Sequence, residues 1–518
     1  MTNRYHNTLH LLFFLALLIA SSWTTQSDAA CRRYIPDGTV TLSHSRNAYP
    51  SDFFRPPNQP WIYVAWVWRE TPDVATNHTL SIARSRDLRH WEDSCGQREQ
   101  LPIRLDGSEV IDPIRPNSGL LNNVKVGADR QGRPIVTYQK YVEEGGHLTT
   151  QVFNARLEAS GWAIYQMTHW TTAWTLAGGG SLPASDHNIA FSAVNVGTNG
   201  QLYQSFRRAV ADTSGWPATG SYVLGDNDGL SISNTSYESQ FKVPPKPAEA
   251  LKSAAKPHAF ETGFGANIVY SRVQAPWGQK GTIGGETPDD PTKRSFIRWE
   301  TLPTNRDLPY DCFGRPQSKL TLADQITATC PNSFVRPLSI WTYNDTTSKW
   351  ESTFIDDAWG GCTAAFDFLT YKDVQIVAYY NRNRQMTVAI RKSHGPWRIK
   401  ALDSIFQGWD THNYLTIAVD RNDDIHVVGN VHSAPLSYYR STGLDVSSLK
   451  RLPMTGKQET QVTYPHFFAT PDGRFAFMYR DGASGDGNSW INVYDAPSRR
   501  WNRIDDAPLF QGKPAAWR

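Results

Sequence analysis

Short runs of alternating apolar and polar residues, most of them led by a turn, recur along the chain. Alternation with a period of two is the pattern of a half-buried β-strand. Several runs follow turn sequences such as Asp129-Arg-Gln-Gly and Thr470-Pro-Asp-Gly. The pattern therefore predicts an all-β fold made of many short strands, and the clearest of these runs begin at Trp61, Arg133, Gln201, Val374, Asp424 and Arg474.

A tryptophan closes many of these units. The repeat length of roughly 60–75 residues fits about seven four-stranded units. We therefore predict an all-β, seven-bladed β-propeller of four-stranded antiparallel blades, built as one catalytic domain over residues 31–518. Segment 241–291 is rich in Pro, Lys, Gly and Asp and is predicted to be a long insertion. The closing tryptophans are Trp91, Trp162, Trp216, Trp350, Trp397 and Trp501.

The first thirty residues have a different pattern. Arg4 precedes the apolar run Leu11–Ala20, and small residues follow up to Ala30. This order is typical of a secretory signal peptide, and the apolar run is too short to be a membrane span. We predict a signal peptide over residues 1–30 and a secreted or periplasmic protein with no membrane span.

The overall composition narrows the class of partner. A net charge of +3 over 518 residues gives no support to a nucleic-acid binder, which should carry a basic patch or stripe. The 19 Trp, 22 Tyr and 22 Phe suit an exported sugar-active protein, although a β-rich protein of another function also uses large strand side chains. We predict a monomer that binds no nucleic acid.

Five cysteines suit an oxidising compartment, but their number is odd. Cys31 and Cys95 could pair near the N-terminus, but the sequence does not decide the pairing of the five cysteines. Cys312, Cys330 and Cys362 could supply a second disulfide and one free thiol, or three ligands of a structural Zn²⁺ site. The absence of any CxxC spacing favours the disulfide.

The acidic, glycine-rich stretch Asp481–Asp486 could bind structural Ca²⁺, but a solvated turn is the simpler interpretation. The sequence therefore establishes no cofactor. Structural Ca²⁺ and Zn²⁺ are the two possibilities that it leaves open.

Three of the fourteen histidines fall within residues 410–432, in D-T-H-N-Y-L-T-I-A-V-D-R-N-D-D-I-H-V-V-G-N-V-H. His412 and its neighbour Asn413 precede one strand, and His432 lies at the end of the next. In an antiparallel pair these positions return to the same end. We therefore expect His412 and His432 to face one site, and His426, inside the strand, to be structural.

The same geometry repeats in the next unit. Tyr464 leads into a strand, a Pro-Asp-Gly turn follows, and Arg480 ends the returning strand sixteen residues later. A glycine-rich continuation would let a ligand approach the backbone closely. Two neighbouring blades are thus expected to present two histidines, a tyrosine and an arginine together.

These residue types suit β-elimination from a uronic acid. An arginine can pair with the carboxylate and stabilise the enolate that forms when C5 loses its proton. A histidine or tyrosine can take that proton, and a second such group can protonate the leaving glycosidic oxygen. Histidine suits either role, so the base and the acid remain unassigned.

The runs D-T-H-N-Y-L-T-I-A-V-D, I-H-V-V-G-N-V-H-S-A-P-L-S-Y-Y-R-S-T and T-Y-P-H-F-F, followed by G-R-F-A-F-M-Y-R-D-G-A-S-G-D-G, resemble the BNR-repeat seven-bladed propeller polysaccharide lyases. That family includes ulvan lyases and lyases that cleave L-rhamnose-α-1,4-D-glucuronate linkages. The resemblance implies catalytic roles for His412, His432, Tyr464 and Arg480, substrate contact by Asn413, and an acidic polysaccharide or oligosaccharide as substrate.

The N-terminal part is similar to the family too, in the segments 63–88 and 295–307. Their order differs, because the family's W-V-W-R-E-T-P-D segment follows the His-Asn blade, whereas here it opens the mature chain. The resemblance therefore implies a circularly permuted ring. It also places Arg69 and His78 beside the site as candidate substrate contacts.

Two other functions remain open from the sequence. A sialidase-like or five-bladed glycoside hydrolase would need a pair of Asp or Glu residues facing each other across the channel. A non-catalytic lectin-like propeller would bind sugar through aromatic residues and would need no histidine.

Overall fold

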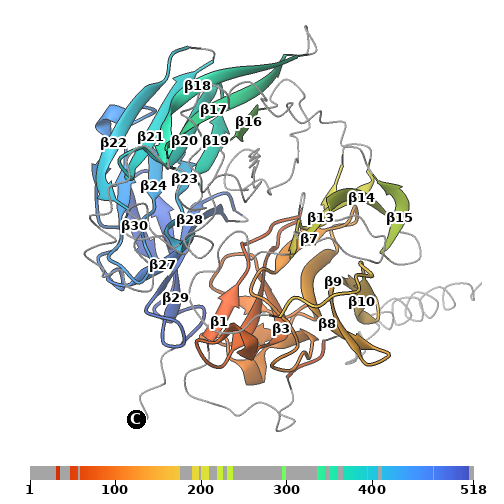
Figure 1. Ribbon diagram of the computed structural model, residues 1–518. Coiled ribbons are helices and arrows are strands. Elements are labelled where there is room, and N and C mark those ends of the chain that lie inside the picture. The colour runs from red at the N-terminus through yellow and green to blue at the C-terminus, as the bar shows by residue number, and fades with distance from the viewer. Residues whose placement is uncertain are drawn as a thin grey trace, which may run out of the picture.

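Thirty β-strands in seven sheets make up the described part of the chain in the computed structural model (Figure 1). The described residues contain short 3₁₀-helices and no α-helix. The structure describes residues 31–34, 47–56, 59–175, 189–197, 200–208, 219–225, 230–236, 295–298, 335–344, 349–359, 366–393, 395–406, 411–470 and 472–512. The predicted signal peptide and the predicted insertion 241–291 lie outside these residues. No helix in the described part is long and apolar enough to cross a membrane.

The sheets are numbered 1 to 7 in chain order. Sheet 1 contains β1 (Asn47–Pro50), β2 (Ile62–Arg69), β3 (Asn77–Ser85), β4 (Trp91–Glu92), β5 (Arg98–Glu99) and β6 (Glu109–Asp112). Sheet 2 contains β7 (Lys125–Ala128), β8 (Pro134–Glu144), β9 (His147–Glu158) and β10 (Gly161–Gln166). Sheet 3 contains β11 (Ile189–Phe191), β12 (Asn195–Val196), β13 (Leu202–Arg208), β14 (Thr219–Gly225) and β15 (Ser231–Ser236).

The second half of the chain supplies the other four sheets. Sheet 4 contains β16 (Ser295–Arg298), β17 (Val335–Asn344) and β18 (Lys349–Trp359). Sheet 5 contains β19 (Asp367–Tyr371), β20 (Val374–Tyr380), β21 (Gln385–Lys392) and β22 (Arg398–Ile405). Sheet 6 contains β23 (Thr416–Val419), β24 (Ile425–Val428), β25 (Tyr438–Arg440) and β26 (Lys450–Arg451). Sheet 7 contains β27 (Val462–Ala469), β28 (Phe475–Asp481), β29 (Asn488–Asp495) and β30 (Arg500–Arg503). The 3₁₀-helices are η1 (Val74–Thr76), η2 (Leu105–Gly107), η7 (Thr411–Asn413) and η8 (Val446–Ser448).

Sheets 2, 5, 6 and 7 are each an antiparallel meander of four consecutive strands. Such a meander is the blade of a β-propeller. The prediction of an all-β fold with four-stranded antiparallel blades is therefore confirmed in these sheets. Sheet 1 differs because β6 pairs with β3 beside β4, and the described part of sheet 4 has three strands.

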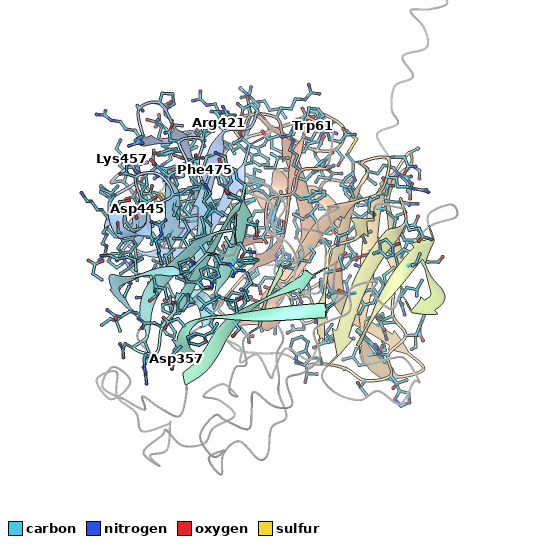
Figure 2. The ribbon with its side chains drawn as sticks, turned by 90° about the horizontal axis from the view of Figure 1, so that it is seen from above. Trp61, Asp357, Arg421, Asp445, Lys457 and Phe475 are labelled. Carbon is cyan, nitrogen blue, oxygen red and sulfur yellow. A yellow bond between two sulfur atoms is a disulfide. The ribbon has the colours of Figure 1, made fainter. Side chains whose placement is uncertain are left out.

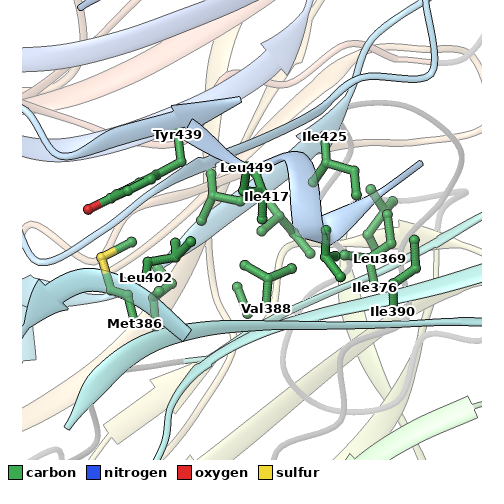
Figure 3. Packing of buried hydrophobic residues seen from close by; sticks show 14 of the residues in the cluster. Leu369, Ile376, Met386, Val388, Ile390, Leu402, Ile417, Ile425, Tyr439 and Leu449 are labelled. Carbon is green, nitrogen blue, oxygen red and sulfur yellow. The ribbon is translucent and has the colours of Figure 1, made fainter. Parts of the chain in front are cut away.

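Buried apolar side chains join the sheets face to face in a continuous order. Clusters link sheet 4 to 5, 5 to 6, 6 to 7, 7 to 1, 1 to 2 and 2 to 3. Between sheets 5 and 6, Leu369, Ile376 and Val388 meet Ile417 and Ile425 (Figure 3). Complete burial of an aliphatic side chain of this size contributes about 1.5–3 kcal/mol. Packing between blades, rather than a separate core, therefore holds the fold together.

The two ends of the chain meet where sheet 7 packs on sheet 1. Phe53 lies 4.2 Å from Phe468 between ring centroids, and Trp66 lies 4.8 Å from Phe510. Phe510 forms isolated β-bridges to Ile103, which lies between β5 and β6, and to Ser489 in β29. The C-terminal segment therefore contacts both sheets. Figure 1 shows β29 beside β1 at this junction.

The strand directions place corresponding turns of the blades on one face. Trp61 precedes β2, and Arg421 lies between β23 and β24. Figure 2 shows both residues at the same edge of the molecule. The opposite ends of these two strands, where β2 and β24 finish, therefore lie away from this edge.

Cys31 and Cys95 form a disulfide, a pairing that the sequence left open. Asp93 lies close to both sulfurs, but sulfurs joined in a disulfide are not metal ligands, and the described part of the chain holds no other group of three potential ligands. Cys312, Cys330 and Cys362 lie outside the described residues, so the zinc alternative stays a prediction. In the predicted calcium stretch, the Asp481 carboxylate accepts the backbone N–H groups of Thr460 and Gln461, at 3.2 and 2.9 Å.

Candidate functional site

His412 and His432 lie against each other at the end of sheet 6 where β23 begins and β24 finishes. His412 is in η7, which leads into β23, and His432 follows β24. Their imidazole rings are stacked, with centroids 4.3 Å apart and planes 17° from parallel. Both side chains are half-buried. The antiparallel pairing of β23 and β24 brings these residues together, as the sequence spacing predicts.

Tyr464 brings sheet 7 into the same cluster. Its ring lies edge-on to His412, with centroids 5.4 Å apart. The residue sits in a β-bulge between Thr463 and His466, and its φ of 58° is in the left-handed region. That conformation is costly for a bulky side chain, by about 1–3 kcal/mol. Bulges commonly re-aim a side chain beside a functional site, and this bulge turns Tyr464 toward the histidines.

Arg480 comes from β28, opposite Thr463 in the strand ladder. Its guanidinium carbon lies 4.9 Å from the centroid of the Tyr464 ring. The side chain is buried, and its Nε donates to the carbonyl oxygen of Gly482 at 3.2 Å. No carboxylate of the described residues forms an ion pair with it. Arg480 is thus a buried cation that the described part of the chain leaves without an anion.

Gly487 leaves room for the side chain of Arg480. A Cβ atom on Gly487 would lie 2.7 Å from the Cγ and Cδ atoms of Arg480. Any larger residue there would push the arginine out of its position. The glycine-rich continuation therefore serves the packing of Arg480 itself.

Tyr49, in β1 of sheet 1, joins the cluster from the other end of the chain. Its ring lies 6.2 Å from that of Tyr464, and its hydroxyl is hydrogen-bonded to the Ser484 hydroxyl. The guanidinium carbon of Arg69 lies 4.0 Å from the Tyr49 ring centroid, and that of Arg480 lies 5.8 Å from it. Two arginines from neighbouring sheets therefore share one aromatic ring.

Arg69 and His78, both predicted as substrate contacts, have different surroundings. Arg69 is buried, and it donates to the side-chain oxygens of Asn77 at 2.7 Å and Asn122 at 2.8 Å. The side chain of His78 has no exposed surface, and its ring nitrogens meet Glu70 at 2.8 Å and Thr79 at 3.0 Å. The structure brings Arg69 to the cluster through Tyr49, whereas His78 lies behind Glu70.

Asn413 lies beside His412 in η7 and is buried. Its backbone carbonyl accepts a hydrogen bond from the Tyr380 hydroxyl of sheet 5. This bond holds the start of β23 against the neighbouring blade. Substrate contact by the Asn413 side chain stays a prediction.

His426 is buried between sheets 6 and 7, away from the stacked pair. Its Nδ1 atom lies 2.8 Å from the Tyr438 hydroxyl, and its Nε2 atom lies 3.3 Å from Asp420 Oδ2. Burial lowers the pKa of His426 below its ordinary value, and the Asp420 carboxylate offsets only part of this effect. Its surroundings are those of a structural residue.

Tyr49 and Ser484 were not among the sequence-predicted residues. Ser484 lies in the glycine-rich stretch, which was the only signal near it. Tyr49 lies in the short strand N-A-Y-P, far from the histidines in sequence. Its place in the cluster depends on the packing of sheet 1 against sheet 7.

The cluster combines two imidazoles, a phenol and a guanidinium from two adjacent blades, with a second arginine and phenol from a third. Such a set can bind an anionic group and can move protons between a substrate and a histidine or tyrosine.

Comparison with known families gives a match to a model described as "BNR repeat-containing family member", over residues 21–170 and 374–517. These two segments cover more than half of the chain and contain every residue of the cluster. No curated protein matches the sequence.

Solved structures give distant likenesses. The polysaccharide lyase Uly1 has 20% identity and a TM-score of 0.25, over 29% of this chain and 43% of that one. A six-bladed fucose-binding lectin from Aleuria aurantia has 8% identity and a TM-score of 0.34, over 88% and 94%. A putative 6-phosphogluconolactonase from Bacteroides fragilis has 9% identity and a TM-score of 0.36, over 83% and 92%. Scores this low decide neither the number of blades nor the activity.

Proposed function

The chain belongs to the BNR repeat-containing family, and from this premise we propose that it is an exported polysaccharide lyase. Its substrate would be a uronic-acid-containing glycan of the ulvan or rhamnose-glucuronate type, cleaved by β-elimination. The observation that carries the proposal is the stacked His412–His432 pair beside Tyr464 and Arg480. Arg480 is buried, and no carboxylate of the described residues pairs with it.

Arg480 binds the uronate carboxylate in this proposal. A buried cation without an anion is costly, and a substrate carboxylate would supply the missing partner through paired hydrogen bonds. The same contact stabilises the enolate that develops when C5 loses its proton. The Tyr464 ring against the guanidinium limits the directions from which the carboxylate can approach.

The two histidines divide the proton transfers between them. In β-elimination a base takes the C5 proton, a double bond forms between C4 and C5, and the C4–O bond breaks with a proton delivered to the leaving oxygen. The stacking, with ring centroids 4.3 Å apart, puts both imidazoles in one site. A neutral ring can act as base, and a protonated ring or Tyr464 can assist the leaving oxygen.

We further propose that the seven sheets close into one seven-bladed, circularly permuted ring. The sheets pack face to face in the order 4, 5, 6, 7, 1, 2, 3, which supports this arrangement. The contacts of Phe510 with both sheet 7 and the region beside sheet 1 support it too. A closed ring tolerates new termini because its ends already lie side by side.

In this proposal the protein is a monomer and acts outside the cytoplasm. The Cys31–Cys95 disulfide is of the kind that persists in oxidising compartments, which supports this location.

One assay tests the proposal. The full chain is incubated with ulvan, with a rhamnose-glucuronate glycan and with neutral glycans as controls, while ultraviolet absorbance and reducing ends are followed together. A lyase produces both signals on a uronate glycan, because the new chain end carries a C4–C5 double bond. Reducing ends without absorbance would indicate hydrolysis, and binding with neither signal would indicate a lectin; either result overturns the proposal.

A further inference from the structure

We infer that Thr463 is a positioning residue that holds three parts of the candidate site in register. Its hydroxyl oxygen accepts the backbone N–H of Ser433, next to His432, at 2.7 Å. Thr463 directly precedes Tyr464 in the chain, and it pairs with Arg480 across the β27–β28 ladder. Thr463 is buried, and it contacts the backbone beside His432, precedes Tyr464 and pairs with Arg480.

The hydrogen bond to Ser433 is part of a junction between two blades. Ala434 and Val462 form an isolated β-bridge, in which the Val462 N–H donates to the Ala434 carbonyl at 2.7 Å. The bridge fixes the distance between the His432 loop and β27. The hydrogen bond between Ser433 and the Thr463 hydroxyl lies one residue closer to His432 and Tyr464 than this bridge.

The backbone on both sides of this hydrogen bond is strained. Ser433 has a φ of 50° and Tyr464 a φ of 58°, both in the left-handed region that non-glycine residues rarely adopt. Such conformations persist only where the surrounding structure over-determines them. The Thr463 hydroxyl supplies one of the contacts that hold them.

Thr463 has no exposed surface, so it acts through His432 and Tyr464 rather than on a substrate. Misplacement of catalytic groups by about 1 Å can cost about 100-fold in rate. Loss of the hydroxyl acceptor should therefore lower turnover more than it lowers binding. The kinetic consequence rests on the proposed lyase function, whereas the positioning itself does not.

The experiment compares Thr463→Val, which keeps the shape and removes the acceptor, with Thr463→Ser, which keeps the hydroxyl. Thr416→Val is the matched control, because Thr416 is buried in the first strand of the neighbouring blade and its hydroxyl has no hydrogen-bond partner among the described residues. We expect T463V to lower kcat about 10- to 100-fold with KM changed less than about 3-fold. T463S and T416V should stay within about 3-fold of the parent protein.

A second measurement does not depend on activity. The imidazole NMR signals of His432, identified by their loss in His432→Ala, should move in T463V and stay unchanged in T463S and T416V. If the parent protein cleaves no glycan, the proposed function fails, and the NMR comparison alone still decides the inference. Unchanged His432 signals and unchanged kcat in T463V would overturn it. If T463V does not fold, Thr463→Ala removes the same acceptor with a smaller side chain and is judged by the same two readouts.

Discussion

His432 and His426 lie six residues apart on one hairpin, yet the structure gives them opposite surroundings. His426 is fully buried between two sheets, with a tyrosine hydroxyl at one ring nitrogen and an aspartate near the other. His432 is half-buried and stacked on a second histidine, beside a segment with left-handed backbone. The difference separates a residue enclosed by the packing of two sheets from one that we propose takes part in the chemistry.

The arginines of the two neighbouring blades repeat this contrast. Arg440 ends β25 and donates to the Tyr494 hydroxyl at 3.0 Å and to the Arg499 carbonyl at 2.6 Å. Arg480, one residue before the end of β28, lies near two aromatic rings, with one hydrogen bond to Gly482 and no acid partner among the described residues. Buried polar groups are normally satisfied, so Arg480, which has no acid partner among the described residues, is the arginine for which we propose a ligand.

The largest expected effect comes from the stacked pair. His412→Ala combined with His432→Ala should lower β-elimination by about 100- to 10,000-fold, because both the base and its partner are removed. Initial rates of double-bond absorbance measure the loss. His426→Gln is the control on the same hairpin and should retain turnover within about 3-fold at a temperature where it is folded. Full activity in the double variant would falsify the assignment of the site.

The arginine contrast predicts the next largest effect. Arg480→Gln should reduce kcat/KM by about 100- to 1,000-fold, because the enolate loses its cation. Arg480→Lys keeps the charge but loses the forked geometry, so it should recover only part of this loss. The same kinetic assay on Arg440→Gln, which pairs with His426 at the opposite end of the neighbouring blade, should show little change. Equal losses in the two glutamine variants would mean that both arginines are structural.

Tyr464→Phe tests whether the Tyr464 hydroxyl transfers a proton or only donates a supporting hydrogen bond. The ring contacts to His412 and Arg480 remain, and only the hydroxyl is lost. A supporting hydrogen bond from the hydroxyl predicts a loss of about 10-fold in kcat. A loss of about 100-fold or more would instead assign a proton transfer to Tyr464. Far-ultraviolet circular dichroism of both proteins checks that the blade is unchanged.

The smallest expected effect is on the pH dependence of stability. Burial lowers the folded-state pKa of His426, so the unfolded chain binds this proton more readily. Its contribution to stability is therefore fully present above about pH 6.5, the unfolded value, and is lost as the pH falls below it. Thermal unfolding midpoints between about pH 5 and about pH 8 should fall more steeply with acid for the parent protein than for His426→Gln.

Glu99 acts in the same pH range with the opposite sign. Burial raises its pKa to about 7, and the Arg33 guanidinium offsets only part of this effect. Stability from this group falls as the pH rises from about 4.5 toward 7. Because Glu99 is present in both proteins, the difference between their curves isolates His426. Parallel curves would show that His426 does not titrate differently on folding.

Much of the fold could be predicted because its signals are local. The runs beginning at Trp61, Asp424 and Arg474 become β2, β24 and β28, and the turns before them match the blade ends. The meeting of His412 with His432, and of Tyr464 with Arg480, also follows from antiparallel pairing between strands adjacent in sequence. These contacts require only one hairpin each.

Contacts between blades could not be predicted in the same way. Tyr49 reaches Tyr464 and Ser484 only because sheet 1 packs on sheet 7, across more than four hundred residues of sequence. The hydrogen bond from Ser433 to Thr463 and the left-handed bulge at Tyr464 likewise depend on how two blades meet.

The sequence by itself determined the strands, the hairpins and the residue types at the ends of the blades, because alternation and turn residues act over a few positions. The tertiary structure alone decided which of those ends form one cluster, and which histidine and which arginine are held inside a blade by hydrogen bonds, as His426 and Arg440 are. The physical reason is that burial, ion pairing and ring stacking depend on distances between blades, and the chain fixes those distances only when the sheets pack.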